Sequence, residues 1–308
     1  MLKQYALVTL SIVFLMACRI PNHPADNKAE YQNNSDETFD NYWYAGVAEI
    51  NSYELEQPRY GEMREGEAVL IFVTEDFLTK NQVKREHETN DKYTSALKLN
   101  FNRKFTTGIY DYSMMTSVFS AVNQSRNNFP IKISNSVQEW CGQSFTQLNQ
   151  TKGHYHLRTF SYFENEGDVN RLLPLNNTED GIWLQIRIAE DQIPEGEVEM
   201  IPGIQYQRLS HVALRPYKAI IKKSSEKIDS SGEAITSLSI TYPELERTLS
   251  IFYLQEFPHK IVGWEEQRQS NGKQVTTKAN LKKTILEPYW DQKSLKDSVL
   301  RKELMLQH

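Results

Sequence analysis

The chain has 308 residues and a formal net charge of −5, and its acidic and basic residues are interspersed rather than clustered. It has no basic patch interleaved with aromatic residues, which argues against a nucleic-acid partner. Only two cysteines are present, and if Cys18 carries a lipid then Cys141 has no partner for an intramolecular disulfide. We therefore expect the hydrophobic core to supply the stability, and Cys141 to be buried in it.

The N-terminus has the pattern of a secretory signal peptide over residues 1–17. Lys3 supplies a positive charge, and an apolar run follows from Ala6 to Ala17. That run is about 12 residues long, whereas a helix that crosses a bilayer needs roughly 20. We expect this segment to be cleaved rather than to span the membrane.

The junction after the apolar run resembles the lipobox of bacterial lipoproteins. Leu15 takes its apolar position, Ala17 its small position and Cys18 that of the modified cysteine. Met16 is a less usual occupant. The resemblance implies cleavage before Cys18, a diacylglyceryl thioether on its sulfur and an acylated amine; two or more chains turn marginal membrane binding into stable anchoring. The alternative is an ordinary signal peptide with a chance cysteine.

A flexible tether is expected to follow, with the lipidated cysteine and tether covering residues 18–41. The segment is polar, contains Pro21 and Pro24 and lacks hydrophobic periodicity. Arg19 follows Cys18, and no acidic cluster stands there. In bacteria that read acidic residues at this place as a sorting signal, the pattern favours the outer membrane, facing the periplasm.

One β-rich domain is expected over residues 42–290, where apolar and aromatic runs of strand length alternate with turn residues. Strands are expected within 42–55, 67–73, 92–101, 108–122, 131–148, 154–163, 198–201, 205–221, 234–242, 247–256, 260–267 and 274–286. Gly142 is expected to bend the fifth of these runs. Asn271-Gly272 is the clearest tight turn, because this pair supplies the positive φ values of a type I′ turn.

Two helices are expected among these strands. Over Glu179–Ala189, Ile182, Trp183 and Ile186 have helical spacing and Thr178 is a candidate N-cap, although a strand remains an alternative. A C-terminal helix is expected over residues 291–308.

The pair Ser294 and Asp297 resembles a capping box at the start of that C-terminal helix. We expect Leu295, Val299, Lys302 and Leu306 to share one face of this helix.

The order of elements predicts a mainly β fold. Successive strands joined by short turns imply an antiparallel meander. A sheet of about a dozen strands must curl or close. We therefore expect a curved antiparallel sheet, a half-barrel or barrel, with one or two covering helices.

Two resemblances bear on this fold. Phe257–Trp264, followed by a polar turn and the run Val275–Thr284, resembles the last strands of LolA/LolB-like periplasmic proteins and of a related family of domains of unknown function, over about 40 residues. The resemblance implies a concave face that takes a lipid or another apolar ligand. Through Tyr60–Glu75 and Gln138–Gly142, the mature chain also resembles an uncharacterised lipoprotein family of Bacteroidetes. Some of its members are labelled septum-formation inhibitor Maf, but the Ser-x-x-x-Arg element of Maf nucleotide pyrophosphatases is missing here.

Catalytic candidates are few. His154 and His156 share one face of an expected strand, as zinc ligands would, with His211 and His259 as possible partners; ordinary surface or lumen histidines are the alternative. Cys141 is a candidate nucleophile, but Glu139 on the same side would raise its pKa, which favours an unreactive thiol.

Two groups of charged residues are also considered. Neighbouring Glu265 and Glu266 point to opposite faces of a strand, so we expect a solvated hairpin end rather than an acid/base pair. A dense charged stretch could form a salt-bridged loop or a rim that recognises a partner; it comprises Glu54, Glu56, Arg59, Glu62, Arg64, Glu65 and Glu67.

The sequence thus predicts a lipid-anchored envelope protein, not an enzyme, with no cofactor and no metal. Its 16 Tyr, 13 Phe and 5 Trp suit either a large core or an apolar pocket. We expect it to bind or carry a hydrophobic small molecule, or to act as an interaction module for an envelope protein. A structural or assembly role is the alternative, and a metal-dependent hydrolase at His154 and His156 is a more remote one.

Overall fold

The computed structural model describes residues 37–123, 129–228 and 232–307. The chain divides into a unit of residues 1–34 and a unit of residues 35–308, and all described residues belong to the second. No helix in these ranges combines the length and the apolar composition that crossing a bilayer requires.

The second unit is built mainly from strands. They are β1 (Ala48–Arg59), β2 (Glu62–Leu78), β3 (Val83–Lys84), β4 (Tyr93–Thr107), β5 (Tyr110–Ala121), β6 (Lys132–Glu139), β7 (Gly142–Thr151), β8 (His154–Ser161), β9 (Val169–Pro174), β10 (Asn177–Thr178), β11 (Gly196–Ile201), β12 (Tyr217–Ile228), β13 (Ala234–Tyr242), β14 (Arg247–Leu254), β15 (Ile261–Ser270) and β16 (Lys273–Glu287). The α-helices are α1 (Glu37–Trp43), α2 (Glu179–Ile188), α3 (Ile204–Ser210) and α4 (Val299–Glu303), with 3-10 turns at Glu190–Gln192, Pro243–Leu245 and Leu295–Ser298.

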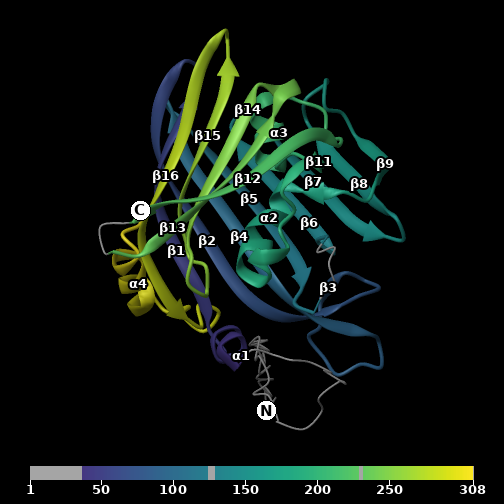
Figure 1. The fold of residues 1–308 in the computed structure, drawn as a ribbon, viewed down its shortest axis with the longest axis vertical. Coiled ribbons are helices and arrows are strands. Elements are labelled where there is room, and N and C mark those ends of the chain that lie inside the picture. The colour runs from purple at the N-terminus through teal and green to yellow at the C-terminus, as the bar shows by residue number, and fades with distance from the viewer. Residues whose placement is uncertain (1–36, 124–128, 229–231, 308) are drawn as a thin grey trace, which may run out of the picture. The chain divides into compact units, whose positions relative to one another are not determined.

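The strands form one sheet, in the order β10-β11-β12-β13-β14-β15-β16-β1-β2-β4-β5-β6-β7-β8-β9, with β3 paired to β2 (Figure 1). Neighbouring strands pair antiparallel except β10 with β11. Because β9 and β10 lie at the two ends of this order, the sheet is curved but not closed. The predicted curved antiparallel sheet is therefore confirmed as a half-barrel.

Helix α2 fills the concave side of the sheet (Figure 1). Its Trp183 contacts Phe101 on β4 and Trp264 on β15, with ring centroids 5.2 and 5.3 Å away. Every residue from Glu179 to Arg187 is buried. The predicted helix is thus confirmed and its strand alternative is wrong. The Thr178 hydroxyl accepts a hydrogen bond from the Gly181 N–H at 3.1 Å, as an N-cap does.

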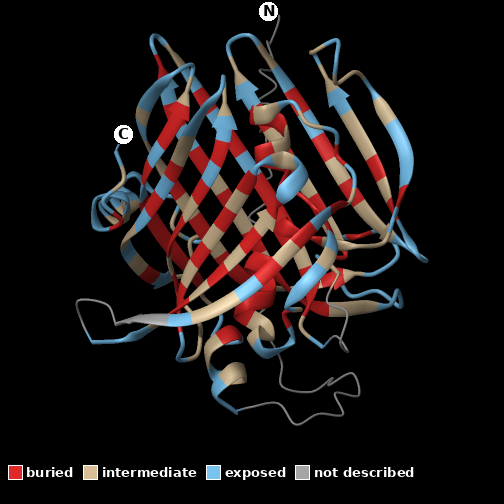
Figure 2. Cartoon of the chain, turned by 45° about the horizontal axis from the view of Figure 1, so that its top comes forward, coloured by how far each residue is buried: buried red, intermediate tan, exposed pale blue. Residues whose placement is uncertain are grey.

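Part of the sheet is covered on both faces, which explains the uninterrupted apolar run in β2. Leu70 and Phe72 face the main core, whereas Val69, Ile71 and Val73 pack with a second cluster that includes Ile285 and Leu304. Each large apolar side chain buried in this way contributes about 1.5–3 kcal/mol. Figure 2 shows the burial concentrated inside the curved sheet, with the hairpin ends exposed.

The C-terminal segment differs from the prediction. The helix expected over residues 291–308 is limited to the 3-10 turn Leu295–Ser298 and to α4, although the capping box of Ser294 and Asp297 is present. Leu295 is 94% exposed and Val299 is also exposed, while Leu304 is buried. A 3-10 turn has three residues per turn, so its junction with α4 shifts the apolar stripe away from the predicted face.

The start of the run 205–221 was expected to be a strand but forms α3. The Ile204 N–H at the start of α3 donates to the Asp180 carboxylate at 3.0 Å. A Cβ on Gly203 would lie 2.6 Å from Glu179 Oε1, so the close approach of α3 to α2 requires glycine there. A contact between segments more than twenty residues apart has no local signature. Helix α1 was not predicted either.

Two expected turns can be compared directly. Asn271 and Gly272 have φ values of 51° and 72° between β15 and β16, which confirms the tight turn. The run 131–148 is not one bent strand: Trp140 and Cys141 form the turn between β6 and β7. This difference decides where Cys141 lies.

Candidate functional site

The first candidate is the charged interior beside α2. Arg187, in the last turn of α2, donates from Nη1 and Nη2 to the two carboxylate oxygens of Glu49 at 2.7 and 2.6 Å. Both side chains are fully buried. Burial alone would raise the pKa of Glu49, but the charge and hydrogen bonds of Arg187 outweigh it and hold that pKa below its ordinary value. This ion pair fixes the C-terminal end of α2 to the sheet.

A second buried ion pair fixes the other end of α2. Arg247 on β14 donates from Nη2 to Glu179 at 2.8 Å and from Nε to Glu266 at 2.9 Å. Burial by itself would lower the pKa of Arg247. The two carboxylates have the larger effect and raise that pKa well above its ordinary value. A glutamate in the first turn and an arginine in the last turn also complement the helix dipole. Both pairs therefore hold α2 in the concavity.

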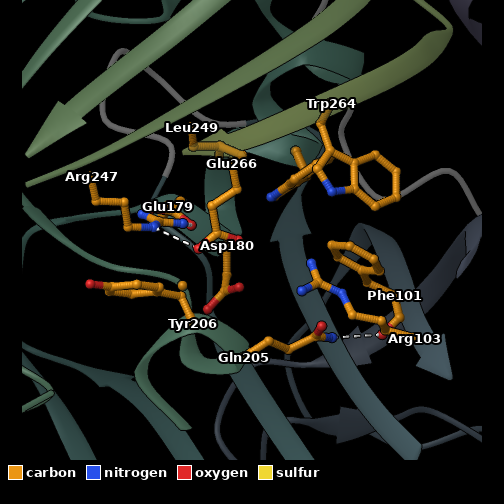
Figure 3. A pocket seen from close by; sticks show the side chains of 12 residues that line it. Phe101, Arg103, Glu179, Asp180, Gln205, Tyr206, Arg247, Leu249, Trp264 and Glu266 are labelled. Carbon is orange, nitrogen blue, oxygen red and sulfur yellow. Dashed lines mark hydrogen bonds and ion pairs between the residues drawn. The ribbon is translucent and has the colours of Figure 1, made fainter. Parts of the chain in front are cut away.

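The cavity between these charges is too small for a substrate. Figure 3 shows Asp180, Arg247 and Glu266 pointing into it, and its volume is about 20 Å³. That volume has room for about one water molecule. Burial and the neighbouring Glu179 raise the pKa of Asp180 to about 7. Although a raised carboxyl pKa is a common mark of active sites, there is no room here for a reacting ligand.

The second candidate is at one end of the strands, which we call the hairpin rim. It consists of the turns Tyr60–Gly61, Gly108–Ile109 and Trp140–Cys141 and of the β8–β9 loop, residues 162–168. Tyr60, Ile109, Trp140 and Tyr162 are all exposed there. Most large apolar side chains of the described domain are buried instead, so four at one rim suggest a binding surface.

An open groove of about 480 Å³ lies at this rim. We call it the Trp140 groove; its lining residues are Asp111, Ser113, Gln138, Glu139, Trp140, Gly142 and Gln143. Strands β5, β6 and β7 supply them, through the registers Ser113↔Gln138 and Gln138↔Gln143, except Trp140, which lies in the turn between β6 and β7. The side chain of Trp140 is 71% exposed. The groove has the volume of an ordinary ligand site, but its wall is polar rather than apolar.

Buried charges hold the groove in shape. Arg208 of α3 forms ion pairs with Glu139 at 3.4 Å and with Glu166 of the β8–β9 loop at 3.3 Å. His211 Nδ1 lies 2.9 Å from the same Glu166. A Cβ on Gly142 would lie 2.6 Å from the ring of Tyr162, so the close approach of that ring to the backbone requires glycine here. These contacts connect α3, the loop and the β6–β7 turn, so the groove is largely preformed.

Cys141 is exposed at this rim, which corrects the prediction of a buried thiol. The correction follows from the turn, because a turn residue has no sheet face to bury it. The hydrogen bond and the charge of Glu139 raise the thiol pKa, as was predicted for a neighbouring carboxylate. Glu139 Oε2 also accepts the Cys141 backbone N–H at 2.8 Å.

We expect Glu139→Gln to increase the rate at which Cys141 reacts with a maleimide several-fold near neutral pH. Removing the negative charge lowers the thiol pKa, and the thiolate is the reactive form. The rate can be followed by mass spectrometry of the folded protein. Asp111→Asn removes another groove carboxylate and is the control; equal rates for both variants would contradict the role of Glu139.

The predicted histidine pair does not form a metal site. His154 and His156 do lie on one face of β8, but His156 Nε2 contacts Asn170 Oδ1 at 2.6 Å and His154 contacts the carbonyl of Lys152 at 3.3 Å. His211 contacts Glu166 of the hairpin rim. His259 lies in the β14–β15 turn at the other end of the strands, where its ring contacts Tyr253. Within the described ranges, no three metal-ligating side chains come together.

Glu265 and Glu266 do point to opposite faces, but Glu266 is not solvated. It is only 5% exposed and bonds to Arg247 inside the sheet, so the prediction of a solvated hairpin end is wrong for this residue. Glu265 faces outward and pairs with Lys278. Arg59 of the charged stretch reaches inward to the carbonyl of Leu209 at 2.7 Å. Cys18 lies outside the described residues.

Sequence reasoning missed the Trp140 groove because it placed Trp140 and Cys141 inside a strand. The available signal was Gly142 two residues after Trp140, which fits a hairpin turn as well as a bulge. Comparison of the chain with protein-family models, curated proteins and solved structures finds no match. The function is therefore inferred from the geometry of this groove.

Proposed function

We propose that the chain is a cell-envelope lipoprotein, anchored through Cys18, whose β domain is a binding module that holds a partner in the Trp140 groove. The observation that carries the proposal is an indole that is 71% exposed at the edge of a groove of about 480 Å³. An exposed, rigidly supported aromatic side chain beside a concavity is typical of binding hot spots.

The filled concavity favours this role over carriage of an apolar ligand inside the sheet. The inner face is occupied by α2, and the cavity left beside it is about 20 Å³. A lipid chain would have to displace α2 and both of its buried ion pairs, Glu49–Arg187 and Arg247–Glu179. Of the two roles considered from the sequence, the interaction module therefore requires less rearrangement.

The direction of the strands is consistent with an anchored module. The chain enters the described domain at α1, and Trp43 of α1 packs against Phe72 of β2, with ring centroids 6.3 Å apart. Phe72 pairs with Glu49, at the start of β1, whereas the hairpin rim is at the end of β1. The rim is therefore at the opposite end of β1 from α1, where the described residues begin.

The anchor is tested by Cys18→Ser. We expect this variant to lose metabolic labelling with palmitate and to remain uncleaved or become soluble, because the thioether and the acylated amine both require the cysteine. The control is Cys141→Ser, which should be labelled like the parent protein. Palmitate labelling that persists in Cys18→Ser would contradict the lipoprotein assignment.

The groove is tested through the thiol beside it. If a partner occupies the groove, Cys141 should react more slowly with a bulky maleimide in opened envelopes than in the purified protein. Trp140→Ala should remove this protection. The control thiol is Leu295→Cys, placed at a side chain that is 94% exposed and outside the groove. Equal Cys141 rates in envelopes and in solution would overturn the proposal.

A further inference from the structure

The lining of the Trp140 groove restricts what it can bind. Five of the seven lining residues end in hydrogen-bonding groups: Asp111, Ser113, Gln138, Glu139 and Gln143. Trp140 alone presents a large apolar face, and Gly142 contributes only backbone. An apolar ligand would strip water from these amide and carboxylate groups without replacing their hydrogen bonds, which is unfavourable.

The negative charge of the lining disfavours anionic ligands. The lining contains two carboxylates, Asp111 and Glu139, and no cationic side chain. The nearest buried cation, Arg208, already pairs with Glu139 and Glu166. A phosphate, a uronate or a nucleic-acid backbone would therefore meet like charge in the lining, and the exposed Lys104 that pairs with Ser113 from β4 is not itself part of that lining.

We propose that the Trp140 groove binds a neutral oligosaccharide of the cell envelope. A pyranose ring has a face of C–H groups that stacks on an indole, whose face carries partial negative charge. Around that face it has hydroxyls that each donate and accept. The amides of Gln138 and Gln143 and the carboxylate of Asp111 can bind such hydroxyls from one wall of the groove.

The contacts that hold the groove in shape suit a weakly apolar, polyhydroxylated ligand. Binding such a ligand yields little hydrophobic gain, so affinity depends on a small cost of ordering the protein. Glu139 is already held by Arg208 at 3.4 Å and by the Cys141 N–H at 2.8 Å. These contacts fix one side of the wall before any ligand arrives.

This inference rests on the proposed function and is tested with the full-length protein extracted in mild detergent. The probes are neutral tetrasaccharides of glucose, mannose and N-acetylglucosamine, an oligouronate and a lysine-rich peptide, titrated by calorimetry and by tryptophan fluorescence. Trp43, Trp183 and Trp264 are buried and Trp290 is partly buried, whereas Trp140 is exposed. The fluorescence change that is lost in Trp140→Ala therefore reports on the site.

We expect a neutral tetrasaccharide to bind with a blue shift and a loss of fluorescence quenching by acrylamide. Trp140→Ala should weaken that binding at least tenfold, and Gln143→Ala should weaken it less. The matched control is Phe160→Ala, an aromatic side chain that is 54% exposed on β8 and outside the groove lining; it should leave the affinity unchanged.

Three outcomes would overturn the saccharide assignment: no neutral tetrasaccharide binds, the oligouronate or the peptide binds better, or Trp140→Ala has no effect. The first two leave the binding-module proposal standing if Cys141 is still protected in envelopes. If Cys141 is not protected in envelopes, the binding-module proposal is contradicted, whether or not a saccharide binds. The two proposals can therefore fail separately.

Discussion

Glu49→Gln is expected to lower the free energy of unfolding by about 3–5 kcal/mol, because it leaves Arg187 charged, buried and without its counter-ion. Glutamine keeps the volume of the side chain and can still accept the Asn51 Nδ2–H, which donates to Glu49 at 2.7 Å. The loss therefore reports on the charge pair rather than on packing. Urea unfolding at neutral pH measures it.

Two controls make this test specific. Glu244→Gln breaks the ion pair between Glu244 and Arg215, whose side chains are 56% and 44% exposed, respectively. This change should cost less than about 1 kcal/mol. The double variant Glu49→Leu/Arg187→Met should regain most of the stability, since a buried pair can be replaced by apolar residues of similar volume at little cost. If Glu49→Gln were as mild as Glu244→Gln, the assignment of this pair as the attachment of α2 would be wrong.

The effect of Glu49 should also depend on pH. Its pKa is lowered in the folded protein, so its contribution is present above the unfolded pKa and is lost as the pH falls through the folded pKa. The difference between the parent protein and Glu49→Gln should therefore shrink in acid, below about pH 4.

Arg247→Met is expected to be at least as damaging, again by about 3–5 kcal/mol near neutral pH. Arg247 neutralises Glu179 and Glu266, and it also lowers the pKa of Asp180. Without it, three buried carboxyl groups face one another, with Arg103 as a more distant cation. Unfolding in urea measures the loss, and Arg215→Met on the surface is the control.

The sign of the pH dependence distinguishes this variant from a packing defect. Without Arg247, Glu266 loses the main charge that lowers its pKa and Asp180 loses one of the charges that lower its own, so in the folded state both hold their protons to a higher pH than in the parent protein. Groups that hold their protons more tightly in the folded state lower the stability of the protein as the pH rises above about 4.3, the ordinary glutamate pKa. The deficit of Arg247→Met should thus be smaller at mildly acidic than at alkaline pH. Parallel stability curves for the parent protein and the variant would contradict this account.

Local patterns in the sequence predicted much of the fold. Alternating side chains in β4 bury Leu97, Leu99 and Phe101 on one face, as expected of a strand. The spacing of Ile182 and Ile186 after a threonine cap predicted α2. These predictions succeed because the periods of strand and helix follow from backbone geometry and so are visible within a few residues.

The candidate site was not predictable in the same way. A change of one or two residues in where a hairpin turns moves Cys141 from a strand to an exposed turn and creates the groove beside Trp140. Turn boundaries have weak local signals when a strand and a turn both accommodate glycine. The saccharide assignment thus depends on a position that only the paired registers of β6 and β7 reveal.

By itself, the sequence determined that this chain is mainly β, where its interior helix runs and that Asn271-Gly272 is a tight turn, and it predicts an exported, lipid-anchored protein. The tertiary structure decided which side of the sheet α2 occupies, that Glu266 is buried and that α3 is a helix. The physical reason is distance along the chain. Glu49 and Arg187 are 138 residues apart, and the energy that joins them belongs to a contact that no local pattern contains.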